Sequence, residues 1–257
     1  MGYPAWKAFR LFRLPDPRDA TTLPRSVKAA LPPIRGRLEQ IRERIARAAS
    51  RSGRDPGSVS LVAVTKGVPP EIVKEALAAG LGDFAENRVQ EAERKIEVLG
   101  REVARWHMVG QLQRNKANRA AALFDRIHSV DRADLADALA RRKGERAGLR
   151  TLVQVNVGGN PAQGGIDPHL LEPLLEHVIS LPGLVCDGLM CIAPIGRRSD
   201  EARAAFVRTR ELRDALERAL GVALPELSMG MSGDYEAAVE EGSTMVRIGT
   251  ALFGERG

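Results

Sequence analysis

Two hydrophobic periods alternate along the chain from Leu38 onward. Short apolar runs bounded by polar residues are typical of buried parallel strands, and the segments between them carry apolar residues three and four positions apart, as amphipathic helices do. The first helical pattern spans 38–51 and ends before Gly53, a common helix stop. Similar patterns lie at 89–99 and 205–220. Eight strands are predicted, at residues 60–66, 83–86, 105–109, 126–130, 151–157, 184–192, 226–229 and 245–248.

Eight strands joined by helices are the number that closes a parallel α/β barrel of the (β/α)8 TIM type. One helix precedes the first strand, and only nine residues follow the eighth, so we expect the 38–51 helix to cover the barrel beside the last strand. An open doubly wound sheet is the alternative. That fold usually has a glycine-rich loop after its first strand, whereas Lys66-Gly67-Val68-Pro69 stands there in this chain.

Residues 1–34 show neither period and hold six of the 15 prolines, which predicts a flexible extension ahead of a barrel domain at 35–257. The extension lacks the apolar segment of a secretory signal. Residues 1–37 carry eight basic and two acidic groups, and the remaining 220 residues carry 31 of each sign. The net charge of +6 therefore belongs to residues 1–37, so the N-terminal extension is left as the candidate for binding nucleic acid.

Composition narrows the class of protein further. With 44% hydrophobic and 28% charged residues, the chain has the usage of soluble globular proteins and not of collagen-like or disordered ones. No uncharged apolar run approaches the ~20 residues that cross a bilayer, so no membrane association is expected. The two cysteines, Cys186 and Cys191, lie five positions apart on one predicted strand, too far to form a disulfide. We therefore expect a cytoplasmic protein.

Lys66 is the first candidate for chemistry, because parallel barrels build their active sites at the carboxyl ends of the strands. A period of two places Lys66 on the same strand face as Val62 and Val64. If that face points inward, the ammonium lies in an apolar barrel mouth, where desolvation lowers its pKa and frees the amine to attack an aldehyde. The alternative is a surface lysine that reaches solvent from the strand end.

Two further clusters follow other strand ends. After strands seven and eight, glycines that admit an anion and hydroxyls that can donate to it favour a phosphate site, although ordinary turns are the alternative. This cluster comprises Gly230, Ser232, Gly233, Gly249 and Thr250, with Arg247 on the strand face of Gly249. Polar residues at 86–91 and 106–116 lie on and directly after strands two and three, where they are candidates to line a pocket. Glu91 and Arg94 fit helix-surface charge equally well. His107 has no further ligands at short spacing, so no metal site is expected.

Together these segments resemble the pyridoxal 5′-phosphate (PLP) homeostasis proteins, single-domain relatives of the N-terminal barrel of alanine racemase. The resemblance covers roughly residues 38–254 and implies a fold-type III PLP-binding barrel. It rests on Val-Ala-Val-Thr-Lys at 62–66, Gly188-Leu189-Met190 and the segments 86–91, 106–116, 228–234 and 242–254.

The resemblance also implies a set of cofactor-binding residues. Lys66 would form the internal aldimine with PLP, and Arg247 would face the pyridine nitrogen. Ser232, Gly249 and Thr250 would bind the phosphate. The pocket residues implied besides these are Asn87, His107 and Met229. One position departs from the family, since Gln163 stands where members commonly carry a lysine, so the resemblance carries no role of that lysine in cofactor transfer over to this chain.

By this resemblance, we expect a monomeric PLP carrier in intracellular vitamin B6 homeostasis, which holds the aldehyde and releases it to PLP-accepting apoenzymes. The alternative is a minimal PLP-dependent amino-acid racemase. Full racemases of this type continue into a second domain that supplies a catalytic tyrosine, whereas this sequence ends at Gly257 and has only Tyr3 and Tyr235. A third hypothesis, a barrel that binds nucleic acid through the basic extension, is less expected.

Overall fold

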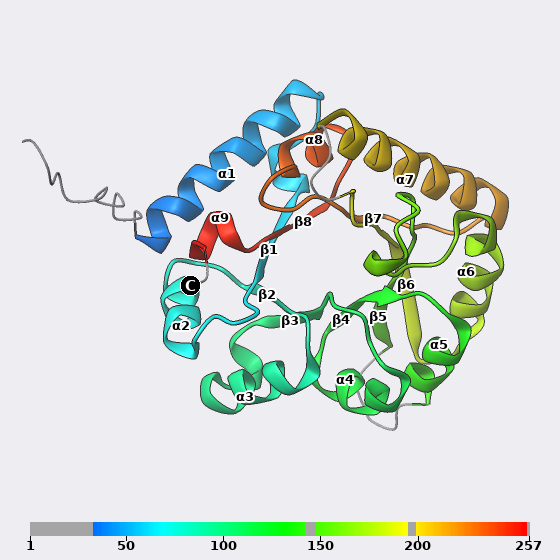
Figure 1. Cartoon of the computed structure of the whole chain (residues 1–257), viewed down its shortest axis with the longest axis horizontal. Helices are drawn as coiled ribbons and strands as arrows, with labels where there is room; N and C mark the ends of the chain where they lie inside the picture. The colour runs from blue at the N-terminus through cyan, green and yellow to red at the C-terminus, as the bar shows by residue number, and fades with distance from the viewer. Residues whose placement is uncertain (1–32, 142–147, 195–198, 256–257) are drawn as a thin grey trace, which may run out of the picture. The chain divides into compact units, whose positions relative to one another are not determined.

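Eight parallel strands form a closed barrel in the computed structural model, which describes residues 33–141, 148–194 and 199–255. Each strand pairs with the next along the chain, and the last pairs with the first (Figure 1). The predicted (β/α)8 barrel is confirmed. The strands are β1 (Ser60–Val64), β2 (Asp83–Glu86), β3 (Arg105–Met108), β4 (Arg126–Val130), β5 (Leu149–Gln154), β6 (Leu184–Met190), β7 (Glu226–Ser228) and β8 (Met245–Ile248).

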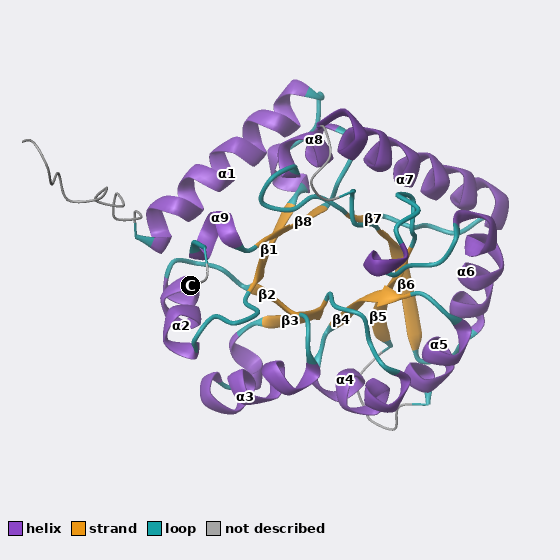
Figure 2. Ribbon diagram, in the orientation of Figure 1, coloured by secondary structure: helices purple, strands orange, loops and turns teal. Residues whose placement is uncertain are grey.

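Helices surround the strand ring on its outer side (Figure 2). The α-helices are α1 (Ile34–Arg51), α2 (Pro70–Ala78), α3 (Val89–Leu99), α4 (Ala117–Leu123), α5 (Ala133–Ala140), α6 (Leu171–Ser180), α7 (Ser199–Leu220), α8 (Tyr235–Glu240) and α9 (Thr250–Phe253). Short 3-10 turns are η1 (Pro56–Ser58), η2 (Arg101–Val103), η3 (Arg114–Lys116), η4 (Pro161–Gln163) and η5 (Pro168–Leu170).

The buried apolar side chains form two separate layers, because successive strand residues point to opposite faces. Outward residues such as Phe84 and Trp106 pack under the helices, and their rings lie 5.8 Å apart. A smaller cluster fills the barrel interior and includes Val62, with Val64 packed against it. The interpretation of Lys66 depends on the prediction that this face of β1 points inward. That prediction is confirmed for Val62 and Val64.

Helix α1 closes the outer layer beside β8 and β1, as expected, by packing against α8 and α9 (Figure 1). It begins at Ile34, so the prediction that this residue belongs to the extension is wrong. Ile34 is only 6% exposed and starts an apolar stripe that continues through Leu38, Ile41 and Ile45. Burial of that stripe, at about 1.5–3 kcal/mol for a large aliphatic side chain, extends the helix to the residue after Pro33. The rest of the predicted extension, residues 1–32, lies outside the described residues.

Strand β5 ends at Gln154, three residues before its predicted end. The chain beyond it remains extended but finds a different partner, since the backbone N–H of Asn156 donates to the carbonyl of Ile166 at 2.8 Å. The Ile166 N–H in turn donates to the Gln154 carbonyl at 2.8 Å. Apolar residues alone do not reveal this change of partner, so the sequence pattern overextends the strand.

Gly188 has a physical reason to be glycine within the Gly188-Leu189-Met190 motif. Its φ is +153°, and an added Cβ would lie 1.9 Å from the carbonyl oxygen of Glu226 on the neighbouring strand. A side chain there would push β7 away from β6. The motif therefore preserves barrel closure next to the strand that carries Ser228.

Candidate functional site at the barrel mouth

Lys66 follows β1 at the carboxyl end of the barrel and is half-buried. Its neighbour Thr65 points outward, because the Thr65 hydroxyl donates to Glu86 Oε1 at 2.6 Å and is fully buried. Alternation along the chain therefore puts Lys66 on the mouth side, above Val64. Gly249, at the end of β8, lies against this segment, since an added Cβ would be 3.5 Å from the Val64 carbonyl oxygen.

A buried ion cluster anchors the backbone on both sides of Lys66. The ammonium of Lys95 on α3 donates to the Thr65 carbonyl at 2.5 Å, to Glu86 Oε1 at 2.5 Å and to Glu91 Oε1 at 2.9 Å. Glu91 also accepts a hydrogen bond from the Gly67 N–H. Burial raises the pKa of Glu86, and its bonds to Lys95 and Thr65 act against that rise. Helix α3 thus fixes the position of Lys66 by holding the backbone of the residues on either side of it.

Sequence reasoning missed this cluster. The sequence pattern fits Glu91 as helix-surface charge equally well, and it does not mark Lys95 as a buried residue. The spacing of four residues between them is the available signal, because it places both side chains on one helix face. It does not reveal that Lys95 is only 4% exposed or that it reaches the Thr65 carbonyl.

Ser232 and Gly249 come together, as the phosphate-site prediction requires. The Ser232 hydroxyl oxygen accepts hydrogen bonds from the N–H groups of Gly249 at 3.3 Å and Ala251 at 3.2 Å. Thr250 lies between these amides and is exposed. Gly230 shapes the same loop, because its φ is +91° and an added Cβ would lie 2.5 Å from the Ala238 Cβ. Two amides and two hydroxyls thus gather after β7 and β8, a donor set suited to a phosphate.

Arg247 is a cation inside the barrel, with only 4% of its surface exposed. Its Nη1 donates to the Ser228 carbonyl and to Ser228 Oγ, both at 2.7 Å, and its Nη2 donates to the Cys191 carbonyl at 2.8 Å. These three acceptors are neutral. Burial lowers the pKa of Arg247, although Asp234 acts against this at longer range. Burying an ion without a directly bonded counter-ion costs several kcal/mol, so the site favours an electron-rich ligand.

The three secondary pocket residues lie in different places. Asn87 follows β2 and is half-buried at the mouth. His107 lies inside the barrel with both ring nitrogens engaged, to His128 Nε2 at 2.9 Å and to Asp83 Oδ1 at 3.1 Å. The Met229 side chain packs in the outer apolar layer and is fully buried. The structure therefore brings Asn87 to the mouth, but not the side chains of the other two.

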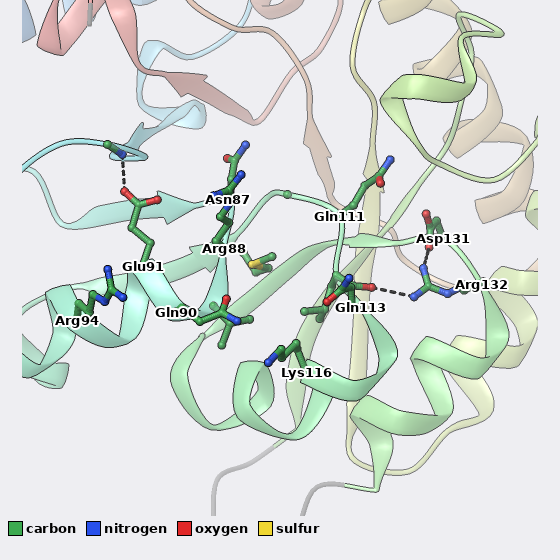
Figure 3. Close-up of a pocket in the computed structure, with 15 residues that line it drawn as sticks. Asn87, Arg88, Gln90, Glu91, Arg94, Gln111, Gln113, Lys116, Asp131 and Arg132 are labelled. Carbon is green, nitrogen blue, oxygen red and sulfur yellow. Dashed lines mark hydrogen bonds and ion pairs between the residues drawn. The ribbon is translucent and has the colours of Figure 1, made fainter. Parts of the chain in front are cut away.

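A groove with a volume of about 1240 Å³ opens beside the mouth, between the start of α3 and the segment after β3 (Figure 3). Its charged residues are mostly basic, and one of its two carboxylates, Asp131, is bonded to Arg132 at 2.6 Å. The groove is lined by Gly67, Asn87, Arg88, Val89, Gln90, Glu91, Arg94, Met108, Gly110, Gln111, Leu112, Gln113, Lys116, Asp131 and Arg132.

Comparison with known proteins gives a consistent result. Residues 37–257 match the family model described as alanine racemase, N-terminal domain. The chain is 44% identical over 221 residues to the pyridoxal phosphate homeostasis protein of Aquifex aeolicus, covering 86% of this chain and 97% of that one. It is 46% identical over 223 residues to the protein of the same name from Pseudomonas aeruginosa, with coverage of 85% and 94%. The chain belongs to the pyridoxal phosphate homeostasis protein family.

Solved structures agree with this assignment. PipY of Synechococcus elongatus in its structure with PLP bound has a TM-score of 0.76 and 41% identity, and the match covers 86% of this chain and all (100%) of PipY. Its structure without PLP gives a TM-score of 0.77. Alanine racemase of Corynebacterium glutamicum, at 17% identity and a TM-score of 0.62, shares the fold.

Gln163, the position that departs from the habit of the homeostasis protein family, has a structural role. Its side chain is 9% exposed, and its Nε2 donates to the Ala193 carbonyl at 2.9 Å. Its backbone carbonyl accepts from Gln154 Nε2 at 2.8 Å. The glutamine thus joins η4 to the end of β5 and to the segment that follows β6.

Other kinds of site find little support within the ranges 33–141, 148–194 and 199–255. No group of three or more His, Cys, Asp or Glu side chains there is arranged to hold a metal ion. None of the helices in those ranges is both long and apolar enough to cross a membrane. Cys186 and Cys191 are free thiols.

Replacing Lys95 with Met should destabilise the protein by about 3–5 kcal/mol, because it leaves the buried Glu86 carboxylate without its ammonium partner. Urea unfolding followed by circular dichroism measures this. The matched control is Lys74→Met on the exposed face of α2, which should change the free energy of unfolding by no more than about 0.5 kcal/mol. Equal effects of the two substitutions would contradict the anchoring role of Lys95.

Proposed function

We propose that the chain binds PLP at the barrel mouth, holds it through an imine bond to Lys66, and serves as an intracellular PLP carrier in vitamin B6 homeostasis. The observation that carries the proposal is the buried Arg247 guanidinium, which among the described residues is bonded only to neutral acceptors and lies two residues from the donors at Gly249. PLP matches this arrangement, because it brings a pyridine nitrogen that accepts a hydrogen bond and a phosphate that carries negative charge.

Each group at the mouth has a distinct task in this proposal. The Lys66 amine would hold the aldehyde of PLP in a reversible covalent bond, formed with release of one water molecule. Arg247 donates to the pyridine nitrogen. Ser232, Thr250 and the amides of Gly249 and Ala251 would hold the phosphate. Asn87 borders the ring, while direct contacts of His107 and Met229 stay predictions from the resemblance.

The relatives support the same cofactor and role. PipY has been solved with PLP bound, and the curated relatives of high identity are named homeostasis proteins. We extend these properties to this chain and expect it to act as a monomer in the cytoplasm.

A carrier accounts for the mouth better than a racemase does. PLP supplies an electron sink for carbanions only to the extent that its ring nitrogen draws charge, and a guanidinium there holds its protons too tightly to give one up. Racemisation also needs an acid or base on each face of the substrate. Tyr235 does not serve, because its ring packs in the outer layer with the Arg44 guanidinium 5.3 Å from the ring centroid.

The decisive experiment is reduction of the PLP-loaded protein with borohydride, followed by peptide mass spectrometry. We expect one phosphopyridoxyl adduct, on Lys66, and its loss in Lys66→Ala. Lys74→Ala, which removes an exposed lysine from α2, should leave the adduct unchanged. A stable adduct on another lysine in Lys66→Ala would refute the assignment.

The groove beside the mouth provides a docking surface for acceptor apoenzymes under this proposal. Gly67, next to Lys66, and Asn87 form the border that it shares with the mouth. Arg88 and Arg94 are exposed on its wall and would attract an acidic surface of the acceptor around its empty PLP site.

Reversing both charges, with Arg88→Glu and Arg94→Glu, should slow PLP transfer to a purified apo-aminotransferase by roughly tenfold at low salt, because steering of the encounter is lost. Recovery of aminotransferase activity reports the rate. The control is Arg208→Glu with Arg218→Glu, which makes the same change in net charge on exposed positions of α7. Equal rates for both double variants would mean that acceptors take PLP from solution without docking here.

A further inference from the structure

Two histidines inside the barrel are hydrogen-bonded to each other, and the proposed cofactor site does not explain them. His107 on β3 is 4% exposed and His128 on β4 is fully buried. His107 Nδ1 lies 2.9 Å from His128 Nε2, and the two rings meet edge to face at 5.1 Å between centroids. Two polar rings in a barrel core need further partners, since an unpaired buried ring nitrogen is costly.

The outer nitrogens of the pair find such partners at opposite ends of the barrel. His128 Nδ1 lies 2.9 Å from Ser228 Oγ, which accepts from Arg247 Nη1 at 2.7 Å. His107 Nε2 lies 3.1 Å from Asp83 Oδ1. Asp83 borders a cavity of about 250 Å³ at the amino-terminal ends of the strands. A continuous chain of four hydrogen bonds thus runs from Arg247 to that cavity.

The chemistry of the two ends fixes the direction of every bond between them. A guanidinium only donates, so Ser228 Oγ accepts from Arg247 and has its single proton left for His128 Nδ1. His128 must then carry its proton on Nε2 and donate it to His107 Nδ1. His107 in turn donates from Nε2 to the Asp83 carboxylate, which only accepts when ionised. With both imidazoles neutral, this pattern gives them the same tautomer, protonated at Nε2.

Burial favours the neutral state of both histidines. Burial by itself raises the pKa of Asp83, but its bonds from Arg105 and His107 outweigh that effect and leave the pKa well below the usual value. Burial lowers the pKa of both histidines, and the Asp83 carboxylate acts against this at His107. Repulsion from His107, Arg247 and Arg126 lowers the pKa of His128 further. The titratable and charged groups that face the pair from the neighbouring elements are Asp83, Arg105, Asp125, Arg126, Arg150, Asp187, Glu226 and Arg247.

We propose that His107, His128 and Ser228 form a one-way hydrogen-bond relay that positions Arg247 for the pyridine nitrogen of the cofactor. The relay makes Ser228 Oγ a fixed acceptor, so the guanidinium is held in one orientation. Every proton along the relay points away from Arg247 and toward Asp83. No proton can be passed from the Asp83 end of the relay to the pyridine nitrogen unless every hydrogen bond in the relay reverses, and Arg247 cannot accept a proton.

This role rests on the proposed function only where it concerns the cofactor. The hydrogen-bond pattern itself is a property of the protein alone, and nitrogen-15 NMR of the imidazole groups reports it without PLP. We expect both His107 and His128 to show the neutral form protonated at Nε2, with no titration between pH 5 and 8, roughly the range in which an ordinary histidine titrates. A proton on Nδ1 of either ring, or titration of either ring in this range, would overturn the relay.

Ser228→Ala cuts the relay at its Arg247 end and removes little volume. His128 should then lose its fixed tautomer, and the affinity for PLP should fall about tenfold, because a hydrogen bond to a charged group is lost. Ser129→Ala is the matched control, since it removes a buried hydroxyl from the same strand as His128 that bonds only to the Gly110 carbonyl in the structure. It should leave the His128 signals unchanged.

The outcomes separate the two proposals. Unchanged His128 signals in Ser228→Ala, or equal PLP affinities of the two serine variants, would refute the positioning role. If the wild-type protein binds no PLP, the proposed function fails, and the imidazole signals of wild type and Ser228→Ala decide the relay by themselves.

Discussion

A positive charge buried in the centre of the barrel is the constraint on which the other features depend. The Arg247 guanidinium can stay there only because the carbonyls of Ser228 and Cys191 and the Ser228 hydroxyl accept its protons. Those acceptors come from the ends of β6 and β7, so barrel closure and the charge support each other. Gly188, which lets β6 approach β7, is part of the same requirement. These neutral acceptors do not balance the positive charge of Arg247, and a ligand with a lone pair and negative charge would do so.

Two separate sets of hydrogen bonds hold the segments that form the mouth around that charge. On one side, Lys95 and its two glutamates tie the backbone of residues 65–67 to α3, which fixes the place of Lys66. On the other, Ser232 bridges the loop after β7 to the amides that follow β8. The Lys66 segment and the amides of Gly249 and Ala251 are therefore held by separate helices and loops at the ends of the paired strands β1 and β8.

The parts that were predictable from sequence depend on local pattern. Eight strands, the inward face of β1 and the grouping of Ser232 with Gly249 follow from short periods and loop composition. The relay was not predictable, because Ser228 lies 100 residues from His128 in the chain and only barrel closure brings them to 2.9 Å. Lys95 was missed for a similar reason, since its bond to the Thr65 carbonyl spans 30 residues. Ile34 and the end of β5 differ because tertiary partners, not local propensity, set those boundaries.

A crystal structure of the protein with PLP tests the central claim most directly. The account predicts the pyridine nitrogen within about 3.2 Å of the Arg247 guanidinium, a usual hydrogen-bond distance, with the phosphate on Ser232 and the amides of Gly249 and Ala251. The bonds from Arg247 to Ser228 should persist in that complex. A pyridine nitrogen that faces a carboxylate, or PLP bound in the groove beside Arg88 and Arg94 and not at the mouth, would contradict it.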